Sequence, residues 1–370
     1  MTWFSPCIWS ADGGYSGIRS FWHNTVIGRA ITNTFWSVLG NDVIQLNGFD
    51  KDPELGKLKP RTPAMFAGTS FSILNYDTNF FDLIKSGTVK IHVADLHHLS
   101  AGKVHLADEA KTALESDAMV CVTGWRHVPP FKFLPEGLDK KIGLPHLPNP
   151  GDTSLSADED IGCQQGLLDK ADAEILERFP RLADPPTFND HYVPLVKQRP
   201  FTIDGADPAA LTPLMLYHLI VPASPAFLRS KNLAFAGAIM NFSNAITAHL
   251  QGLWISAYFD GKLRRDPSNA VAGGDGGKAG TQEGLTLEKV QYETVLFSRF
   301  GKWRYPTDYA SMYPDFVFEA VPYIDLLLAD LGLTVHRKGG WFKEMTDPYG
   351  PEDYIDVNDE WRAKYARGSS

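Results

Sequence analysis

Asp117-Ala118-Met119-Val120-Cys121-Val122-Thr123-Gly124-Trp125 is the stretch on which the interpretation of the fold depends. Met119 to Val122 are all apolar, which is typical of a strand covered on both faces of a sheet. Gly124 has no Cβ, so the backbone can turn sharply after Thr123 and approach another group closely. Trp125 would then lie at the carboxyl end of the strand, where ligands bind in open α/β sheets. The stretch therefore predicts a buried strand and a ligand-binding edge in an α/β fold.

The residues before this stretch predict the helices and strands that would accompany it. A helix is expected within Ser20 to Leu39, because apolar residues recur there at helical spacing. Phe80 to Ser86 is expected to form a short helix that Gly87 ends. Val89 to Val93 alternates between apolar and polar residues, which predicts a half-buried strand, and Lys103 to Leu106 predicts another.

A second informative stretch lies in the other half of the chain. Leu233-Ala234-Phe235-Ala236-Gly237 predicts a strand that ends at a glycine, and a helix is expected from about Ser243 to Phe259. The free N–H groups and the positive dipole end of such a helix face an electron-rich ligand group. Asn241 and Asn244 stand at the helix start, where they would either hydrogen-bond a ligand or cap the helix. Both interpretations stay open.

Together these stretches resemble the flavin-containing monooxygenases. Asp117 followed by an apolar run and Thr123-Gly124-Trp125 is similar to the D-x-x-x-x-x-T-G-Y/W motif of that family. The F-x-G strand end before a helix with Q-x-x-W is similar to Phe235-Ala236-Gly237 followed by Gln251 and Trp254. The order of the helix, strand and hairpin before Thr123 also resembles the family.

The resemblance implies an α/β fold that is the remnant of a flavoprotein with two dinucleotide-binding, Rossmann-like domains. It implies FAD and NADP as cofactors and the oxygenation of a small organic substrate through a flavin hydroperoxide. It points to no catalytic residue. The cofactor-binding residues that it implies are Thr123, Gly124, Trp125, Gly237, Asn241, Asn244 and Gln251.

Neither of the two dinucleotide fingerprints of such an enzyme occurs in the sequence. Gly13-Gly14-x-x-Gly17 has the wrong spacing, follows no expected strand and lacks an acidic residue ~20 positions later. The F-x-G-x-x-x-H motif that joins the two domains in the family is also missing. We therefore expect the C-terminal part of a monooxygenase of this type, N-terminally truncated and inactive alone. A partner or the missing N-terminal half would cover the face it leaves exposed.

On this interpretation the chain has five parts. They are the C-terminal part of an NADP-binding domain (1–125), an insertion with a surface helix (126–213), the closing strand and helix of the FAD-binding domain (214–265), a Gly-rich connector (266–284) and a C-terminal helical extension (285–370) similar to that of fungal members. In the insertion, apolar spacing predicts a helix from Ile161 to Phe179 that Pro180 ends. In the extension, helices are expected over Leu285 to Arg299 and over Val321 to Leu331, the latter closed by glycine.

Composition narrows the class of protein. The 370 residues include 35 basic and 44 acidic side chains, and the net charge of −9 argues against broad binding to nucleic acid or anionic membrane. The apolar runs are shorter than the ~20 residues of a membrane span. Cys7, Cys121 and Cys163 form no paired spacing, which favours a reducing compartment and a core role for Cys121. A cytoplasmic protein with a small-molecule substrate is expected.

Two further interpretations concern alternative sites and functions. His92, His97, His98 and His105 are close in sequence, but His97 and His98 are expected in a hairpin loop between two strands, so a solvated hairpin rather than a metal site is predicted. Besides the monooxygenase, a non-catalytic binding or interaction module derived from the same fold stays open. A hydrolase is disfavoured because no G-x-S-x-G elbow is present.

Overall fold

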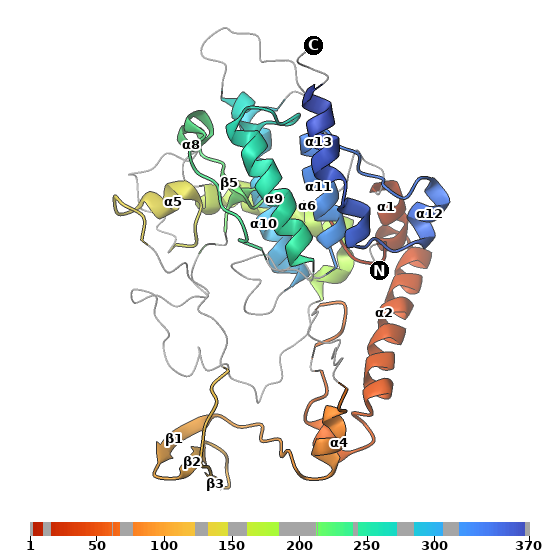
Figure 1. Ribbon diagram of the computed structural model, residues 1–370, viewed down its shortest axis with the longest axis vertical. Coiled ribbons are helices and arrows are strands. Elements are labelled where there is room, and N and C mark those ends of the chain that lie inside the picture. Colours follow the sequence, from red (N-terminus) through yellow and green to blue (C-terminus); the bar gives the residue numbers. More distant parts are fainter. Residues whose placement is uncertain are drawn as a thin grey trace. The chain divides into compact units, whose positions relative to one another are not determined.

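The computed structural model of the chain describes residues 3–9, 16–60, 62–66, 77–122, 132–146, 161–184, 212, 214–239, 243–271, 285–305 and 318–366. The chain divides into two units (Figure 1). The first comprises residues 1–33, 131–185 and 209–370, and the second comprises residues 34–130 and 186–208. Among the described residues, no helix combines the length and the apolar character needed to cross a bilayer.

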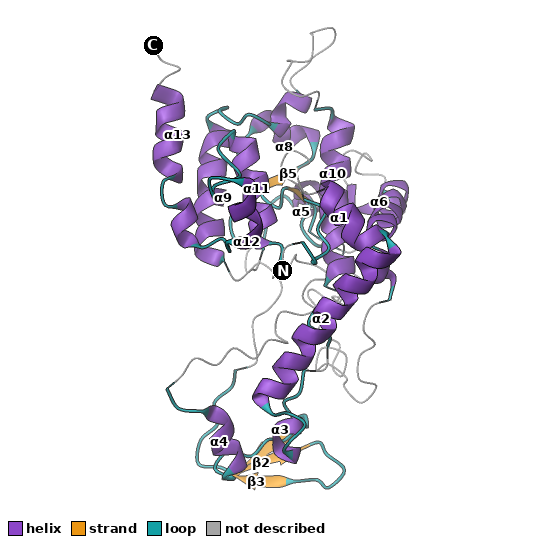
Figure 2. Ribbon diagram, turned by 90° about the vertical axis from the view of Figure 1, so that its right-hand side faces the viewer, coloured by secondary structure: helices purple, strands orange, loops and turns teal. Residues whose placement is uncertain are grey.

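The first unit is mainly helical (Figure 2). Its one small described sheet is the hairpin of β4 and β5, which pairs antiparallel. The elements of this unit are α1 (Ser16–Asn24), the start of α2 (Val26–Asn47), α5 (Leu138–Ile142), η2 (Ile161–Cys163), α6 (Gln165–Arg178), η3 (Pro180–Ala183), β4 (Leu216–Tyr217), β5 (Val221–Pro222), α8 (Pro225–Ser230), α9 (Asn244–Phe259), η5 (Pro267–Ala270), α10 (Leu287–Arg304), α11 (Ala320–Leu331), α12 (Trp341–Thr346), η6 (Pro351–Tyr354) and α13 (Val357–Ala366).

The core of this unit is built by α9, α10 and α11. Helix α11 packs on α9, and α10 packs on α6. Trp254 of α9, Phe300 of α10 and Leu327 of α11 have no exposed surface. The ring of Trp9 lies edge-on to Phe300, with 5.4 Å between ring centroids, so the N-terminal segment is part of this core. Each such apolar side chain contributes about 1.5–3 kcal/mol through burial.

Local sequence signals explain where these helices begin and end. Helix α10 starts after Thr286, whose hydroxyl accepts the Lys289 N–H at 3.3 Å. Helix α11 ends at Gly332, which adopts the left-handed φ of +66° that glycine tolerates. The helices predicted over 243–259, 285–299 and 321–331 are therefore confirmed. The helix predicted over 161–179 is present as η2 and α6, and Ala171 and Ile175 form the buried face of α6.

The second unit contains the rest of α2, α3 (Pro53–Gly56), α4 (Phe80–Lys85), β1 (Leu96–Ser100), β2 (Lys103–Leu106) and β3 (Ala113–Glu115). The strands form an antiparallel sheet in the order β1-β2-β3. Helix α4 confirms the prediction: Asn79 caps it by accepting the Phe81 N–H at 3.1 Å, and Gly87 follows with φ +76°. The helix expected within residues 20–39 is two helices, α1 and α2, with a break at Thr25.

Two strands predicted in this unit are wrong. Val89 to Val93 forms no strand, although Val89 and Ile91 do pack on the buried cluster of this unit. Ala118 to Val122 forms no strand either, and Val120 and Val122 are 86% and 90% exposed. Cys121, expected in the core, is exposed as well. A strand is stable only when a neighbour pairs with its backbone, and apolar content alone does not supply that neighbour.

Two more expectations need correction. His97 and His98 lie within β1 rather than in a loop, while His92 lies outside any strand. Leu233 to Gly237 is not a strand, although the Phe235 N–H donates to the Ile220 carbonyl at 2.8 Å. The described residues form many helices and two small antiparallel sheets, an arrangement compatible with an α/β flavoprotein. The remnant of two dinucleotide-binding domains stays a prediction.

Candidate functional site

Gly237 is the centre of the predicted cofactor edge. Its backbone has φ +74°, a left-handed conformation that favours glycine. The residue is exposed, and a Cβ built on it would meet no atom within 4 Å. A flat ligand could therefore approach the backbone here without meeting a side chain of the described residues.

Gln251 lies behind this turn and is fully buried. Its Oε1 accepts the Gly237 N–H at 2.9 Å, so the structure brings together these two predicted site residues from positions fourteen residues apart. Its Nε2 donates to the Tyr323 hydroxyl at 3.0 Å. Gln251 thus supports the Gly237 backbone from the protein interior, and a direct contact between Gln251 and a flavin stays a prediction.

Asn244 is the first residue of α9 and is exposed. Ser243 precedes it without a side-chain capping bond, so the positive end of this 16-residue helix is not covered by its own N-cap side chain. The open glycine turn and this helix end together fit an electron-rich cofactor such as the one the sequence resemblance implies. Thr123, Gly124, Trp125 and Asn241, the remaining predicted cofactor residues, lie outside the described residues.

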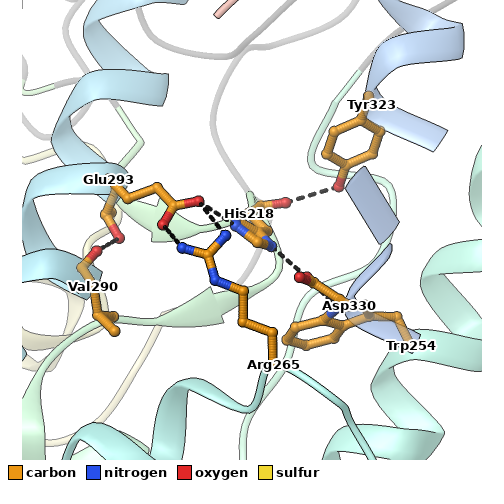
Figure 3. A network of polar contacts seen from close by, with 8 residues as sticks. His218, Trp254, Arg265, Val290, Glu293, Tyr323 and Asp330 are labelled. Atoms are coloured by element: carbon orange, nitrogen blue, oxygen red, sulfur yellow. Dashed lines mark hydrogen bonds and ion pairs between the residues drawn. The ribbon is translucent and has the colours of Figure 1, made fainter. Parts of the chain in front are cut away.

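A buried network of charged side chains lies next to this turn, and its centre is His218 (Figure 3). His218 Nδ1 is 2.7 Å from Asp330 Oδ2, and Nε2 is 2.8 Å from Glu293 Oε1. Trp254 donates its indole N–H to the same Asp330 oxygen at 2.9 Å. Arg265 binds Glu293 through both terminal nitrogens, at 3.2 and 2.6 Å. The network joins the β4–β5 hairpin, α9, α10 and α11.

Both ring nitrogens of His218 face carboxylate oxygens, so these surroundings favour the imidazolium form. Burial favours the neutral ring, but Asp330 and then Glu293 raise its pKa above the ordinary value of 6.5 through charge and hydrogen bonds. For Glu293, burial alone would raise the pKa. The hydrogen bonds and charges of His218 and Arg265 outweigh the effect of burial and hold the pKa of Glu293 below 4.5. The ring is also stacked on Tyr217, with centroids 3.8 Å apart. Two cations and two carboxylates therefore balance each other inside the core.

The backbone at His218 is unusual. His218 and Leu219 have φ of +48° and +63°, which non-glycine residues adopt rarely. They form the turn between β4 and β5, and the His218 carbonyl accepts the Tyr323 hydroxyl at 2.7 Å. The hydrogen bonds from Gly237 to Gln251, Tyr323 and His218 therefore form one continuous chain. His218 has no exposed surface, so this side chain positions other groups rather than meeting a substrate itself.

A second buried ion pair lies elsewhere in the same unit. Arg304 Nε is 2.7 Å from Glu319 Oε1, and both side chains have no exposed surface. Ser5 donates to the same Glu319 oxygen at 2.6 Å, and the Tyr305 hydroxyl donates to the other. This pair ties the N-terminal segment to α10 and to the start of α11.

Two hollows in the described part of the chain lie away from Gly237 and Gln251. A cavity of about 10 Å³, room for a single water, is lined in part by Gly143, His146, Thr212 and Ser224. A surface groove of about 540 Å³ is lined by Asn24, Lys170, Ala173, Glu174, Glu177, Arg178 and Tyr292. Within the described residues, no group of three or more His, Cys, Asp or Glu side chains is arranged to hold a metal ion.

The sequence interpretation missed His218, Arg265, Glu293 and Asp330. Two signals were present: a histidine within the apolar run Leu216 to Val221, and two aspartates, Asp325 and Asp330, within the apolar stretch Ile324 to Leu331. A charged residue inside an apolar segment is rarely buried without a partner. The identity of that partner is not encoded locally, since Asp330 is 112 residues away from His218.

The chain is similar to several fungal FAD-dependent monooxygenases. It is 24% identical over 362 residues to the FAD-dependent monooxygenase avaB of Aspergillus versicolor, covering 93% of this chain and 47% of that protein. It is 25% identical over 362 residues to DEP4 of Alternaria brassicicola, covering 97% and 54%. The corresponding values for resA of Aspergillus sclerotiorum are 25% over 346 residues, covering 89% and 50%.

The chain spans about half the length of the curated relatives it matches. No protein-family model matches it, and no solved structure matches it at a significant level. The similarity nevertheless extends over nearly the whole chain, and each of these relatives is named as an FAD-dependent monooxygenase. The comparisons thus support the flavin monooxygenases as the family that this chain resembles.

Proposed function

We propose that the chain forms part of an FAD-dependent monooxygenase and contributes the wall of the flavin site around Gly237. The observation that carries this proposal is the similarity to FAD-dependent monooxygenases over 89–97% of the chain. The open glycine turn and the exposed first residue of α9 support it. FAD, when bound, would supply the oxygenation chemistry, with NADPH as the electron source that the sequence resemblance implies.

In this proposal the chain's own residues hold and orient the flavin. The Gly237 turn would lie against the flavin ring, with Asn241 and Asn244 hydrogen-bonding its edge. Thr123, Gly124 and Trp125 would contribute at the NADP side. The chain alone would not turn over substrate, because it lacks both G-x-G-x-x-G fingerprints and spans half the length of its relatives.

The test uses the purified 370-residue chain. Binding of FAD is measured by equilibrium dialysis, and NADPH consumption is followed with FAD present. We expect FAD to bind and NADPH to persist. The absence of FAD binding would contradict the role of Gly237, and steady NADPH consumption would contradict the need for further residues.

A matched pair of glycine variants places the flavin. Gly237 and Gly87 have φ of +74° and +76°, and a Cβ at either meets no atom within 4 Å. Gly237→Val and Gly87→Val therefore introduce similar backbone strain, but only the first adds a side chain at the proposed site. We expect Gly237→Val alone to lose FAD. Equal FAD binding by the two variants would place the flavin elsewhere.

A second candidate function is a non-catalytic interaction module. It is favoured by the exposed apolar segment Met119 to Val122, in which Met119 is 48% exposed. A protein partner or a further polypeptide would cover this segment. The dialysis experiment separates the two candidates, because an interaction module has no reason to bind FAD.

A further inference from the structure

We propose that Tyr323 is a positioning residue for the Gly237 turn, because its hydroxyl fixes which end of the Gln251 carboxamide faces Gly237. The consequence for flavin binding rests on the proposed function. The hydrogen-bond relay itself, from His218 through Tyr323 and Gln251 to Gly237, consists of contacts between described residues.

The Tyr323 hydroxyl has a single hydrogen to donate. That hydrogen is donated to the His218 carbonyl at 2.7 Å, since a carbonyl can only accept. Towards Gln251 the hydroxyl can then only accept, so the NH₂ end of the carboxamide must face it, at 3.0 Å. The oxygen of the carboxamide is thereby left facing the Gly237 N–H at 2.9 Å. Without the hydroxyl, the carboxamide NH₂ would lose its acceptor, and the Gly237 N–H alone would be left to select the oxygen end.

The His218 carbonyl is itself held in place. Both His218 and Leu219 have left-handed backbone, a strained conformation that persists only where surrounding contacts fix it. The ion pairs of the His218 ring with Asp330 and Glu293 supply those contacts from α11 and α10. The direction of the carbonyl, and with it the direction of the Tyr323 hydroxyl, follows from the buried network.

The relay ends at the one member that is exposed. Gln251 and Tyr323 have no exposed surface, whereas Gly237 is open to solvent. A glycine turn is flexible by itself, and a turn that is held before the ligand arrives loses less entropy on binding. Tyr323 would therefore act on the flavin through Gln251 and Gly237, without touching it.

The experiment measures hydrogen exchange at the Gly237 amide in the whole chain. Tyr323→Phe removes only the hydroxyl. The matched control is Tyr354→Phe, because the Tyr354 hydroxyl is also buried but has no hydrogen-bond partner in the part of the chain that the structure describes. We expect exchange at Gly237 to become about tenfold faster in Tyr323→Phe, the effect of one lost buried hydrogen bond, and to be unchanged in Tyr354→Phe. The amides of Leu327 and Leu328 report whether α11 stays folded and should not change in either variant.

A second variant covers the case in which Tyr323→Phe fails to fold. Gln251→Met keeps the side-chain length and leaves Tyr323 intact, and it should raise Gly237 exchange to a similar extent. Unchanged Gly237 exchange in these variants, or an equal rise in Tyr354→Phe, would overturn the relay.

FAD titration of the same proteins separates this inference from the proposed function. If the relay serves a flavin, Tyr323→Phe should weaken FAD binding about tenfold while Tyr354→Phe leaves it unchanged. If the wild-type chain binds no FAD but Tyr323→Phe still speeds Gly237 exchange, the proposed function is overturned and the relay is retained. If the wild-type chain binds FAD but Tyr323→Phe leaves Gly237 exchange unchanged, the relay is overturned and the proposed function is retained.

Discussion

Helix α11 carries two buried aspartates that differ in one respect. Asp330 is 1% exposed and lies among His218 and Trp254, which both contact the same carboxylate oxygen. Asp325 is 2% exposed, but its Oδ1 finds no hydrogen-bond partner among the described residues. Burial raises the pKa of Asp325 to about 8, with a smaller contribution from Glu344. The two carboxyl groups lie on one helix and are about equally buried. Whether each one stabilises or destabilises the fold therefore depends on its hydrogen-bond and charge partners.

Glu319, at the start of the same helix, should give the largest effect. Glu319→Gln removes the carboxylate charge that lies 2.7 Å from the buried Arg304 guanidinium. Breaking a buried pair in this way costs about 3–5 kcal/mol of unfolding free energy. Urea denaturation measures this loss. Glu288→Gln, on the exposed first turn of α10, is the control, and a loss there of similar size would show that charge removal acts without regard to burial.

The Asp330 environment is tested by Asp330→Asn. This change weakens the contacts to His218 and Trp254 and should cost about 2–3 kcal/mol at neutral pH. The raised pKa of His218 stabilises the wild-type fold below the ordinary histidine pKa of 6.5, and this contribution is lost as pH rises through the raised value. The difference between the two proteins should therefore narrow at alkaline pH. A difference that widens instead would mean that His218 is neutral in the folded state.

For Asp325 we expect the same kind of substitution to stabilise the protein rather than destabilise it. Asp325→Asn removes an ionisable group that the core disfavours, so it should stabilise the protein by about 1–2 kcal/mol near pH 8. The sign follows from the pKa shift: a folded-state pKa of about 8 against an ordinary 3.8 means that wild-type stability falls as pH rises between these values. The gain should disappear near pH 4, where both proteins are neutral at this position. Thermal denaturation across this pH range measures it, and a gain independent of pH would exclude ionisation as its cause.

An exposed ion pair should have the smallest effect on the unfolding free energy. Arg362 and Asp359 on α13 are 3.0 Å apart, but their side chains are 75% and 79% exposed. Asp359→Asn should change the unfolding free energy by less than about 0.5 kcal/mol, because solvent screens the pair. A loss as large as that of Asp330→Asn would show that distance rather than burial determines the value of these ion pairs.

Helices were the part of this fold that the sequence could predict. The glycine after Leu331, the capping Thr286 and the apolar spacing of 243–259 are local signals, and a helix satisfies its hydrogen bonds within its own segment. The strand predicted over Lys103 to Leu106 is confirmed as β2, but the predictions of the other strands failed for the converse reason. Val89 to Val93 and Ala118 to Val122 have the composition of strands, but pairing depends on a distant neighbour.

The residues of the candidate site also divide into those that the sequence predicted and those that it did not. Gly237 and Gln251 were found through a family resemblance, and the structure shows a hydrogen bond between them. Tyr323, His218 and Asp330 were missed because their roles depend on contacts between elements far apart in the sequence. No local pattern specifies that a tyrosine on α11 meets the carbonyl of a turn 105 residues earlier.

The last helix, α13, is attached differently from the helices of the core. Only Val357 of this helix is buried. Lys364 donates to the Leu331 carbonyl at the end of α11, and Glu360 pairs with Arg337. Salt screens partly exposed charges but leaves apolar packing intact. We therefore expect α13 to detach at high ionic strength before α9, α10 and α11 unfold, which would make the end of the chain its first target for a protease.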